Sequence, residues 1–338
     1  MQIEPRPRFF NIADLVGISP VEGEYTKEDE REELQLFYDN VGQYHIPVWE
    51  NIVGGRVVFL PGSDVRAEMI SECFSQKQTH GAERGIKAYS GTIEDIPVLA
   101  IASGMGSGQT EIIALELMRA MVNKGGAIIR YGSMGALKPV PTVRVGDLLI
   151  AKWAVTADSS FAWMTDNEIA RGARVEISVD VIQCLQNALD AAGFASGAYD
   201  AGCSSVEDFV RPESGVVYHT GGIHSKALLY AQEIGLGPRR KHFERMKRVF
   251  EQDPGLYGSE METALLYTIA RRMNYLMEKY EGRVPLLVGS LGFFIGDSEH
   301  PFHPDPEVRK TAERGLVSTV PYVARELYDE VRLIQPRS

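Results

Sequence analysis

The chain has 338 residues, of which 44% are hydrophobic and 24% charged, a composition typical of a globular protein with a sizeable core. Its formal net charge of −11 argues against general binding of nucleic acid or anionic lipid, although a few arginines can still bind a small anion. The three cysteines are far apart, which fits a reducing cytoplasm, and no apolar run approaches the ~20 residues of a membrane span.

The residue pattern predicts strands that alternate with helices along most of the chain. Strands are expected at 56–62, 127–132, 145–155, 196–205 and 284–293, and a hairpin at 86–103 that turns at Glu94-Asp95. Helices are expected at 26–41, at 63–74 with Ser63 or Asp64 as the N-cap, and at 109–125, 178–193, 259–273 and 305–334. Residues 210–257 show no clear pattern.

This alternation predicts an α/β fold with a mainly parallel twisted sheet and helices on both faces. We expect one domain of three α/β/α layers at 44–338, preceded by an extension at 1–43. No convincing linker or internal repeat divides the chain.

Two arginines follow apolar strands beside glycines: Arg66 after Gly62, and Arg130 in the run AIIRYGSMGA. A buried charge without a partner is costly, and ligands of open α/β sheets bind at the carboxyl ends of strands. Arginine recognises phosphate with two parallel hydrogen bonds. The pattern therefore suggests a bound anion, whereas Arg66 alone could be an ordinary exposed helix residue.

The glycine-rich stretch SGMGSGQTEII, at 103–113, follows a strand and opens a helix. Such a stretch permits an anion to approach a helix N-terminus, but it could equally form a tight structural turn. A dinucleotide site is disfavoured, because an acidic residue should end the next strand and Arg130 lies there instead.

The stretch GSEMETA, at 258–264, places one carboxylate on each side of Met261, where a helix is expected to begin. Acidic residues at a helix start are favoured by the helix dipole, which is one explanation. The other is a sugar site, in which a carboxylate accepts hydrogen bonds from hydroxyl groups.

These motifs, in this order, resemble those of the type I nucleoside phosphorylase family, and of its uridine phosphorylases most closely, over about residues 44–330. The motifs are PGSDVR at 61–66, GMGSGQTEIIALEL at 104–117, RYGSMGA at 130–136, Val145-Gly146-Asp147 and Glu260-Met261-Glu262. The sequence departs from the family where Gly108 and Gln109 replace Pro-Ser and where Glu111 replaces a small residue.

The resemblance implies that inorganic phosphate is a substrate and attacks the nucleoside, with no cofactor and no metal. It assigns phosphate binding to Gly62, Arg66, Arg84, Arg130 and Ser133. It assigns ribose binding to His45, Met261 and Glu262, and it names Arg130, Glu262 and Arg66 as the catalytic residues. In the family, the counterparts of Arg84 and His45 come from a neighbouring subunit, and the histidine contacts the ribose 5'-hydroxyl. A homodimer is therefore expected as the smallest active unit.

Two groups of residues bear on whether the released base is a purine or uracil. Gly292 stands at or near the position of the aspartate that protonates purines in the family, and the nearest carboxylate is Asp297. Uracil recognition would fall to Phe209, after Ser204-Ser205, with Gln232 and Arg239 or Arg240. We therefore expect phosphorolysis of uridine, and of deoxyuridine, in pyrimidine salvage. The alternatives are a purine nucleoside phosphorylase and a non-catalytic nucleoside-binding homologue.

Overall fold

The computed structural model describes residues 26–81, 84–138, 142–156, 174–197, 215–229, 241, 244, 248–249, 252–297 and 302–334. Its strands are β1 (Val57–Pro61), β2 (Ser75–Gly81), β3 (Lys87–Ile93), β4 (Ile96–Ile101), β5 (Gly126–Ala136), β6 (Leu148–Thr156), β7 (Val175–Glu176), β8 (Ala195–Ser196), β9 (Val217–Ser225), β10 (Leu256–Glu260) and β11 (Leu286–Gly296). Its helices are α2 (Lys27–Asn40), α3 (Glu50–Val53), α4 (Asp64–Ser71), α5 (Ser107–Met121), α6 (Val179–Ala191), α9 (Thr263–Glu281), α10 (Pro306–Ser318) and α11 (Val320–Ile334).

One mixed sheet organises the described part of the chain, with the strand order β10-β9-β6-β11-β5-β1-β4-β3-β2. β5 pairs in parallel with β1 and β11, and β1 also pairs in parallel with β4. The hairpin strands β3 and β4 pair antiparallel, as do β11 and β6. The α/β class is confirmed, and the sheet is mixed as expected, with an antiparallel edge formed by β2 and β3.

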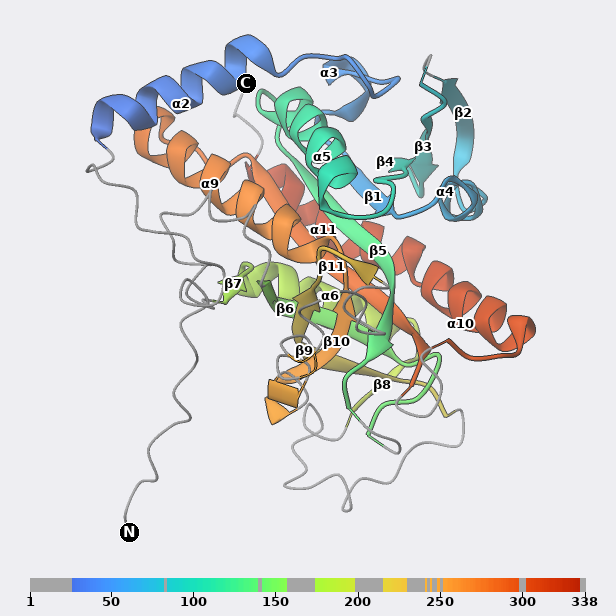
Figure 1. Cartoon of the computed structure of the whole chain (residues 1–338). Coiled ribbons are helices and arrows are strands. Elements are labelled where there is room, and N and C mark those ends of the chain that lie inside the picture. Colours follow the sequence, from blue (N-terminus) through green and yellow to red (C-terminus); the bar gives the residue numbers. More distant parts are fainter. Residues whose placement is uncertain are drawn as a thin grey trace.

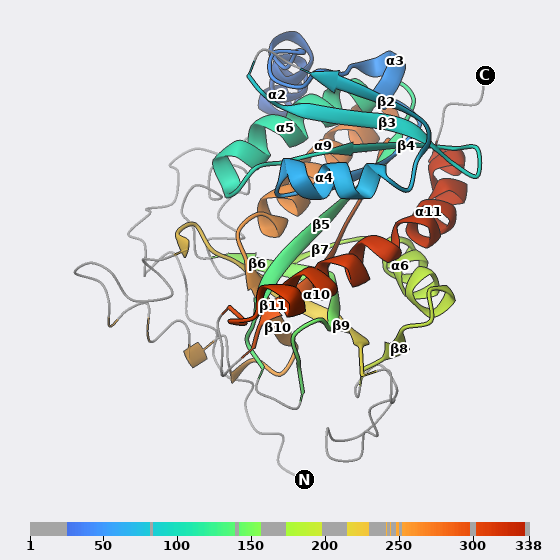
Figure 2. The ribbon, with the colours of Figure 1, turned by 90° about the vertical axis from the view of Figure 1, so that its right-hand side faces the viewer.

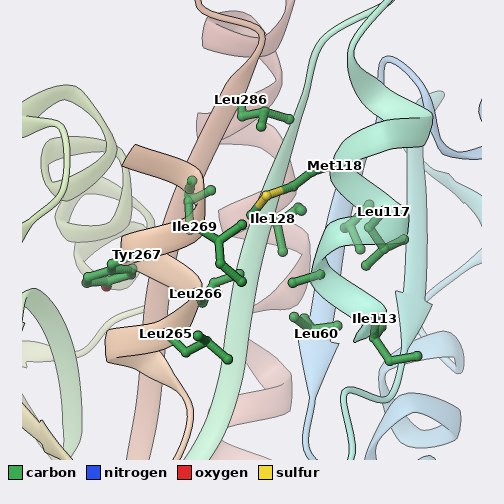
Figure 3. Close-up of a cluster of buried hydrophobic side chains, with 14 of the residues drawn as sticks. Leu60, Ile113, Leu117, Met118, Ile128, Leu265, Leu266, Tyr267, Ile269 and Leu286 are labelled. Carbon is green, nitrogen blue, oxygen red and sulfur yellow. The ribbon is translucent and has the colours of Figure 1, made fainter. Parts of the chain in front are cut away.

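Two hydrophobic cores lie on opposite faces of this sheet, because successive residues of a strand point to opposite sides. Ile128 of β5 belongs to the core shared with α5 and α9, whereas Ile129 belongs to the core shared with α4, α6, α10 and α11. Figures 1 and 2 show α5 and α9 on one side of β5 and the red helices α10 and α11 on the other. Figure 3 shows the first core, in which side chains of α5 and α9 meet those of β1 and β5.

Several predicted elements need correction. β5 does not end at Gly132, as the expected strand does, but continues to Ala136, because β11 pairs with it as far as Gly135. The predicted C-terminal helix is two helices, α10 and α11, separated at Thr319. Pro321 has no backbone N–H to continue the first helix, which accounts for the interruption.

The structure also adds two strands to the stretch at 210–257 in which we recognised no pattern. β9 lies beside β6, and β10 begins at Leu256. The glycines of β9 hide its strand signal: a Cβ on Gly221 would lie 2.4 Å from the Tyr257 ring, and one on Gly222 would lie 2.1 Å from the Trp153 ring. These glycines make room for large neighbours, at the cost of β propensity.

The N-terminal helix α2 is fastened to α9 by polar contacts. The Glu30 carboxylate accepts hydrogen bonds from Lys279 Nζ at 2.5 Å, Tyr280 Oη at 2.6 Å and Tyr275 Oη at 3.0 Å. Arg272 adds a two-pronged contact to Glu33, with its shorter hydrogen bond at 2.6 Å. The hydrogen bonds from Lys279 and Tyr280 lower the pKa of Glu30 from 4.5 to about 2. Because the folded-state pKa is depressed, this stabilisation is present above pH 4.5 and is lost as the pH falls toward 2.

No helix in the described ranges is long and apolar enough to cross a membrane.

The contacts of Glu30 lead to a test of how α2 is held. Glu30→Gln removes a charge that accepts three hydrogen bonds, so amide hydrogen exchange across α2 should speed up by roughly 3- to 10-fold. Glu32→Gln, an exposed position on the same helix, is the matched control and should leave exchange unchanged. Equal exchange in the two variants would show that the Glu30 contacts do not hold α2.

Candidate active site

Arg130 lies in the middle of β5 with its guanidinium buried; the residue is 4% exposed. Its Nε donates to Glu260 Oε2 at 2.9 Å, and its Nη2 donates to Glu262 Oε2. Burial lowers the pKa of Arg130, but the charges of Glu262 and Glu260 more than offset this, so that the pKa is raised overall. Arg130 is therefore a permanent cation that the two carboxylates hold in one orientation.

The third nitrogen of this guanidinium, Nη1, is buried and has no hydrogen-bond partner among the residues that the structure describes. A buried N–H group of a charged side chain is costly to leave unpaired. A Cβ on Gly132 would lie 2.7 Å from Nη1 and 2.8 Å from Cζ, so a side chain there would displace the guanidinium. Gly132 therefore leaves space beside a donor that can take an anion.

Glu260 is the last residue of β10, not part of a helix as the sequence suggested. Besides Arg130, its carboxylate accepts hydrogen bonds from the backbone N–H of Glu262 at 2.8 Å, from that of Thr263 at 3.0 Å, and from Ser225 Oγ. Glu260 thus caps the first turn of α9 while it balances the charge of Arg130. These four hydrogen bonds hold the Glu260 carboxylate in place, where it stabilises the fold.

Glu262 is the N-cap residue of α9 and has fewer donors around it than Glu260. Its Oε1 accepts the backbone N–H of Gly106 at 2.6 Å, and its Oε2 accepts Arg130 Nη2. Gly106 has a φ of +86° and precedes α5, so the glycine-rich stretch does present a helix N-terminus to an anion. In this structure the anion is the carboxylate of Glu262.

The two carboxyl groups differ in their affinity for a proton. Burial raises the pKa of Glu260, but the charge of Arg130 and the hydrogen bonds from Ser225 and Glu262 lower it below its usual range overall. For Glu262, burial raises the pKa and the charge of Arg130 lowers it. The charge of Glu260 raises it again, so the pKa of Glu262 is raised overall. Glu260 is therefore the fixed counterion of Arg130, and Glu262 is the group whose protonation and hydrogen bonding can change.

Arg66 reaches the same region from α4, just beyond the end of β1. Its Nη1 donates to the backbone oxygen of Tyr131 at 3.2 Å, and its Nε pairs with Glu313 at 2.5 Å. Burial lowers the pKa of Arg66 and Glu313 raises it, while the charge of Arg130 lowers it further, so the two cations are electrostatic neighbours. Gly62 precedes α4. A Cβ on Gly62 would lie 3.5 Å from the backbone oxygen of Gly104, so Gly62 is next to the glycine-rich stretch.

The other predicted residues of this group lie close by in the fold. Ser133 is half-buried on β5, where it pairs with Phe293 of β11. The Phe293 ring also lies 5.2 Å from Arg66 Cζ, which places Ser133 on the side of the strand from which Arg66 approaches. Met261 lies between the two glutamates, and its Cε would be 3.7 Å from a Cβ on Gly106. The structure thus places Gly62, Arg66, Arg130, Ser133, Met261 and Glu262 around the carboxyl end of β1, with Arg130 and Ser133 on opposite faces of β5.

Arg84 and His45 are not part of this group within the chain. Arg84 is exposed just before β3. β3 begins where β4 ends, and β4 lies between it and β1, so the strand that Arg84 precedes is two strand spacings, about 10 Å, from β1. His45 lies between α2 and α3, where its Nδ1 is 2.6 Å from Glu116 Oε1 on α5. Neither residue contacts Arg130 or Arg66 in any recorded hydrogen bond of the described chain.

The residues expected to recognise uracil lie outside the described part of the chain. Phe209 falls in 198–214, and Gln232 and Arg239 fall in 230–240. Their roles stay predictions.

The end of β9 is a part of the site that its sequence does not reveal. Ser225 donates to Glu260 and accepts the backbone N–H of Ala264 at 2.8 Å, and the backbone N–H of the buried Lys226 donates to the backbone oxygen of Glu260 at 2.8 Å. β9 therefore fixes both the carboxylate and the first turn of α9. Recognition of β9 as a strand beside β6 would have been the signal that finds Ser225.

The arrangement can bind a small anion and a polyol side by side. Arg130 Nη1 and Arg66 supply positive charge where β1 ends, and Glu262 supplies an acceptor for hydroxyl groups next to that charge. No group of three or more potential metal ligands occurs among the described residues. The described residues of the site supply charge, hydrogen bonds and position.

Comparison with known proteins agrees with this geometry. Residues 56–277, about two thirds of the chain, match the model of the Phosphorylase superfamily. A uridine phosphorylase of Thermococcus kodakarensis is 26% identical over 231 residues, which cover 68% of this chain and 72% of that protein. A uridine phosphorylase of Treponema pallidum is 27% identical over 169 residues, 46% of this chain and 63% of that protein.

A DeoD-type purine nucleoside phosphorylase of Roseobacter denitrificans is 30% identical over 225 residues, which cover 65% of this chain and 77% of that protein. The relatives thus carry the names of both uridine and purine enzymes, at similar identity. The family match spans β1, β5, β10 and most of α9, and so includes Arg66, Arg130, Glu260 and Glu262. The chain therefore belongs to the phosphorylase superfamily, whose members named here are nucleoside phosphorylases.

Proposed function

We propose that this protein cleaves uridine, and deoxyuridine, with inorganic phosphate to give uracil and the corresponding sugar 1-phosphate. The observation that carries the proposal is Nη1 of Arg130, which has no hydrogen-bond partner among the described residues, in a guanidinium held by two buried carboxylates. A phosphate oxygen would satisfy this N–H group, and the second cation, Arg66, lies near enough for the two charges to interact. Gly62 and Ser133 would complete the phosphate site.

The reaction follows from the two neighbouring functions of the site. Cleavage of the glycosidic bond develops positive charge on the sugar and negative charge on the departing base. A phosphate held by Arg130 and Arg66 acts as the nucleophile and, while it approaches C1', stabilises the positive charge of the sugar. Glu262 would accept hydrogen bonds from the 2'- and 3'-hydroxyls, with Met261 against the sugar. The C1'–N bond breaks, its electron pair leaves with the base, and a C1'–O bond to phosphate forms.

The preference for uracil over a purine rests on Gly292. Gly292 has no side chain and so supplies no acid; a Cβ here would lie 2.1 Å from the flexible end of Met134 and 3.0 Å from the backbone oxygen of Gly132. A purine would leave without the proton that an acid at this position supplies. Phe209, Gln232 and Arg239 are the residues proposed to recognise uracil.

We also propose that the active unit is a homodimer, to which Arg84 and His45 contribute across the interface. Exposed apolar side chains support an interface beside His45: Tyr44 is 69% exposed, and Ile112 of α5 is 37% exposed. Ile112 lies four residues before Glu116 on the same helix face, and the backbone N–H of Tyr44 contacts Glu116, so the two side chains flank His45. The two cores on opposite faces of the sheet favour a single three-layer domain at 44–338, with 1–43 as its extension.

The direct test is an assay of base release with a panel of uridine, deoxyuridine, thymidine, inosine and adenosine, each with and without phosphate. We expect phosphate-dependent release of uracil from uridine. Faster cleavage of inosine or adenosine would assign the purine activity instead. Binding of nucleosides without release of any base would identify the non-catalytic homologue.

The phosphate role of Arg130 is tested by Arg130→Ala. A charge-assisted contact is worth about 1.5–3 kcal/mol, so turnover should fall by at least about 10- to 100-fold at low phosphate. Arg325→Ala, which removes an exposed arginine paired with Glu94, is the control and should behave as the wild type. Near-wild-type phosphorolysis by Arg130→Ala, in a folded protein, would refute the assignment.

The two glutamates should separate function from structure. Glu262→Gln should lower turnover far more than Glu260→Gln, since we expect only Glu262 to contact the sugar. Glu260→Gln should instead lower the melting temperature more, because Glu260 caps α9 and also accepts hydrogen bonds from Arg130 and Ser225. Steady-state kinetics and thermal unfolding of both variants decide this, and an equal loss of turnover at matched stability would contradict it.

The shared site predicts recovery of activity when two inactive variants are mixed. Arg84→Ala and Glu262→Ala subunits that exchange form mixed dimers in which one pocket carries both defects and the other carries neither. Random re-pairing restores roughly a quarter of the wild-type sites, because half of the dimers are mixed and each has one intact pocket. If verified exchange restores no activity, each pocket is built within one chain.

A further inference from the structure

Glu116 is a buried carboxylate that the proposed site does not use. It lies in the middle of α5 and is 3% exposed. Its oxygens accept the backbone N–H groups of three successive residues, Tyr44 at 3.3 Å, His45 at 2.9 Å and Ile46 at 2.9 Å. A carboxylate buried against a protein needs donors of this kind, and Glu116 fastens the segment before α3 to α5.

The same carboxylate also contacts the side chain that it fastens. His45 Nδ1 lies 2.6 Å from Glu116 Oε1. A carboxylate only accepts hydrogen bonds, so the imidazole carries its proton on Nδ1, and Nε2 faces away from α5. The side chain of His45 is 25% exposed, so part of the ring can be reached from outside the chain.

His45 and Glu116 lie too far from the active site of their own chain for His45 to reach it. The N–H group of Gly106 marks the end of α5 that contacts Glu262. Glu116 follows Gly106 by ten residues, which is roughly 15 Å along a helix axis. The His45 ring is held at Glu116, one turn along α5 from the exposed Ile112 and next in sequence to the exposed Tyr44, so the proposed interface with a second copy would cover it.

We propose that Glu116 is a positioning residue, which holds His45 with Nδ1–H toward α5 and presents Nε2 to the 5'-hydroxyl of the nucleoside in a second copy's pocket. The inference rests on the proposed function and adds to it the group that orients His45. The three backbone hydrogen bonds to Glu116 hold residues 44–46 against α5. The fourth contact, to Nδ1, fixes the orientation of the His45 ring. Without the carboxylate, the ring is free to rotate and to carry its proton on either nitrogen.

The test pairs two variants, Glu116→Gln and His45→Ala, with two substrates, uridine and 5'-deoxyuridine. Loss of one hydrogen bond to the 5'-hydroxyl should lower kcat/KM for uridine roughly 2- to 10-fold in each variant. The value for 5'-deoxyuridine should stay within about twofold of the wild type, since that substrate lacks the hydroxyl. The double variant should lose no more than either single variant, because both remove the same contact. Glu50→Gln, at the start of α3, is the control.

A second measurement does not depend on activity. Long-range ¹H–¹⁵N spectra of the wild type should show His45, assigned by its loss in His45→Ala, protonated at Nδ1, and Glu116→Gln should shift the proton toward Nε2. A ring protonated at Nε2 in the wild type, or equal losses on both substrates in Glu116→Gln, overturns the inference. A wild type that cleaves no nucleoside overturns the proposed function, whereas the spectra still report on Glu116 alone. If Glu116→Gln does not fold, the wild-type spectrum and the His45→Ala kinetics decide.

Discussion

The organisation of the site depends on one buried cation, the guanidinium of Arg130, in the middle of β5. A charge at this depth is tolerated only with charged partners, and Glu260 and Glu262 hold two of its three nitrogens. This requirement explains why β10 ends in a glutamate that also caps α9, and why a glycine follows two residues after Arg130. The third nitrogen, Nη1, has no partner among the described residues, and in the proposed function it is the donor that a ligand would use.

The two carboxylates serve different ends, although both contact the same arginine. Glu260 is saturated by donors from β9 and α9, and its lowered pKa keeps it ionised. Glu262 has a raised pKa and a hydrogen bond from the loop before α5, so it joins the glycine-rich stretch to the ion pair. Three segments far apart in the sequence thus meet at one carboxylate. A sugar hydroxyl could therefore bind to Glu262 while Glu260 remains the counterion of Arg130.

The sequence predicts the parts of the fold that depend on local pattern. Ser63 caps α4, and the hairpin turns at Glu94-Asp95, where both residues have a positive φ. What it missed depends on partners distant in the chain. β5 continues past Gly132 because β11 pairs with it, and the glycines of β9 make sense only beside Trp153 and Tyr257. Likewise, Glu260 and Glu262 look alike in the sequence, and only the tertiary contacts reveal that one is structural.

The central claim is that a phosphate oxygen is the missing partner of Arg130. A crystal structure of the protein grown with orthophosphate tests this directly. We expect a tetrahedral anion within hydrogen-bond distance of Arg130 Nη1, roughly 2.7–3.0 Å, that also contacts Arg66 while Nε and Nη2 keep their carboxylates. An Nη1 that remains without an anion at saturating phosphate, or that is satisfied by a protein group or a water molecule instead, would contradict the account.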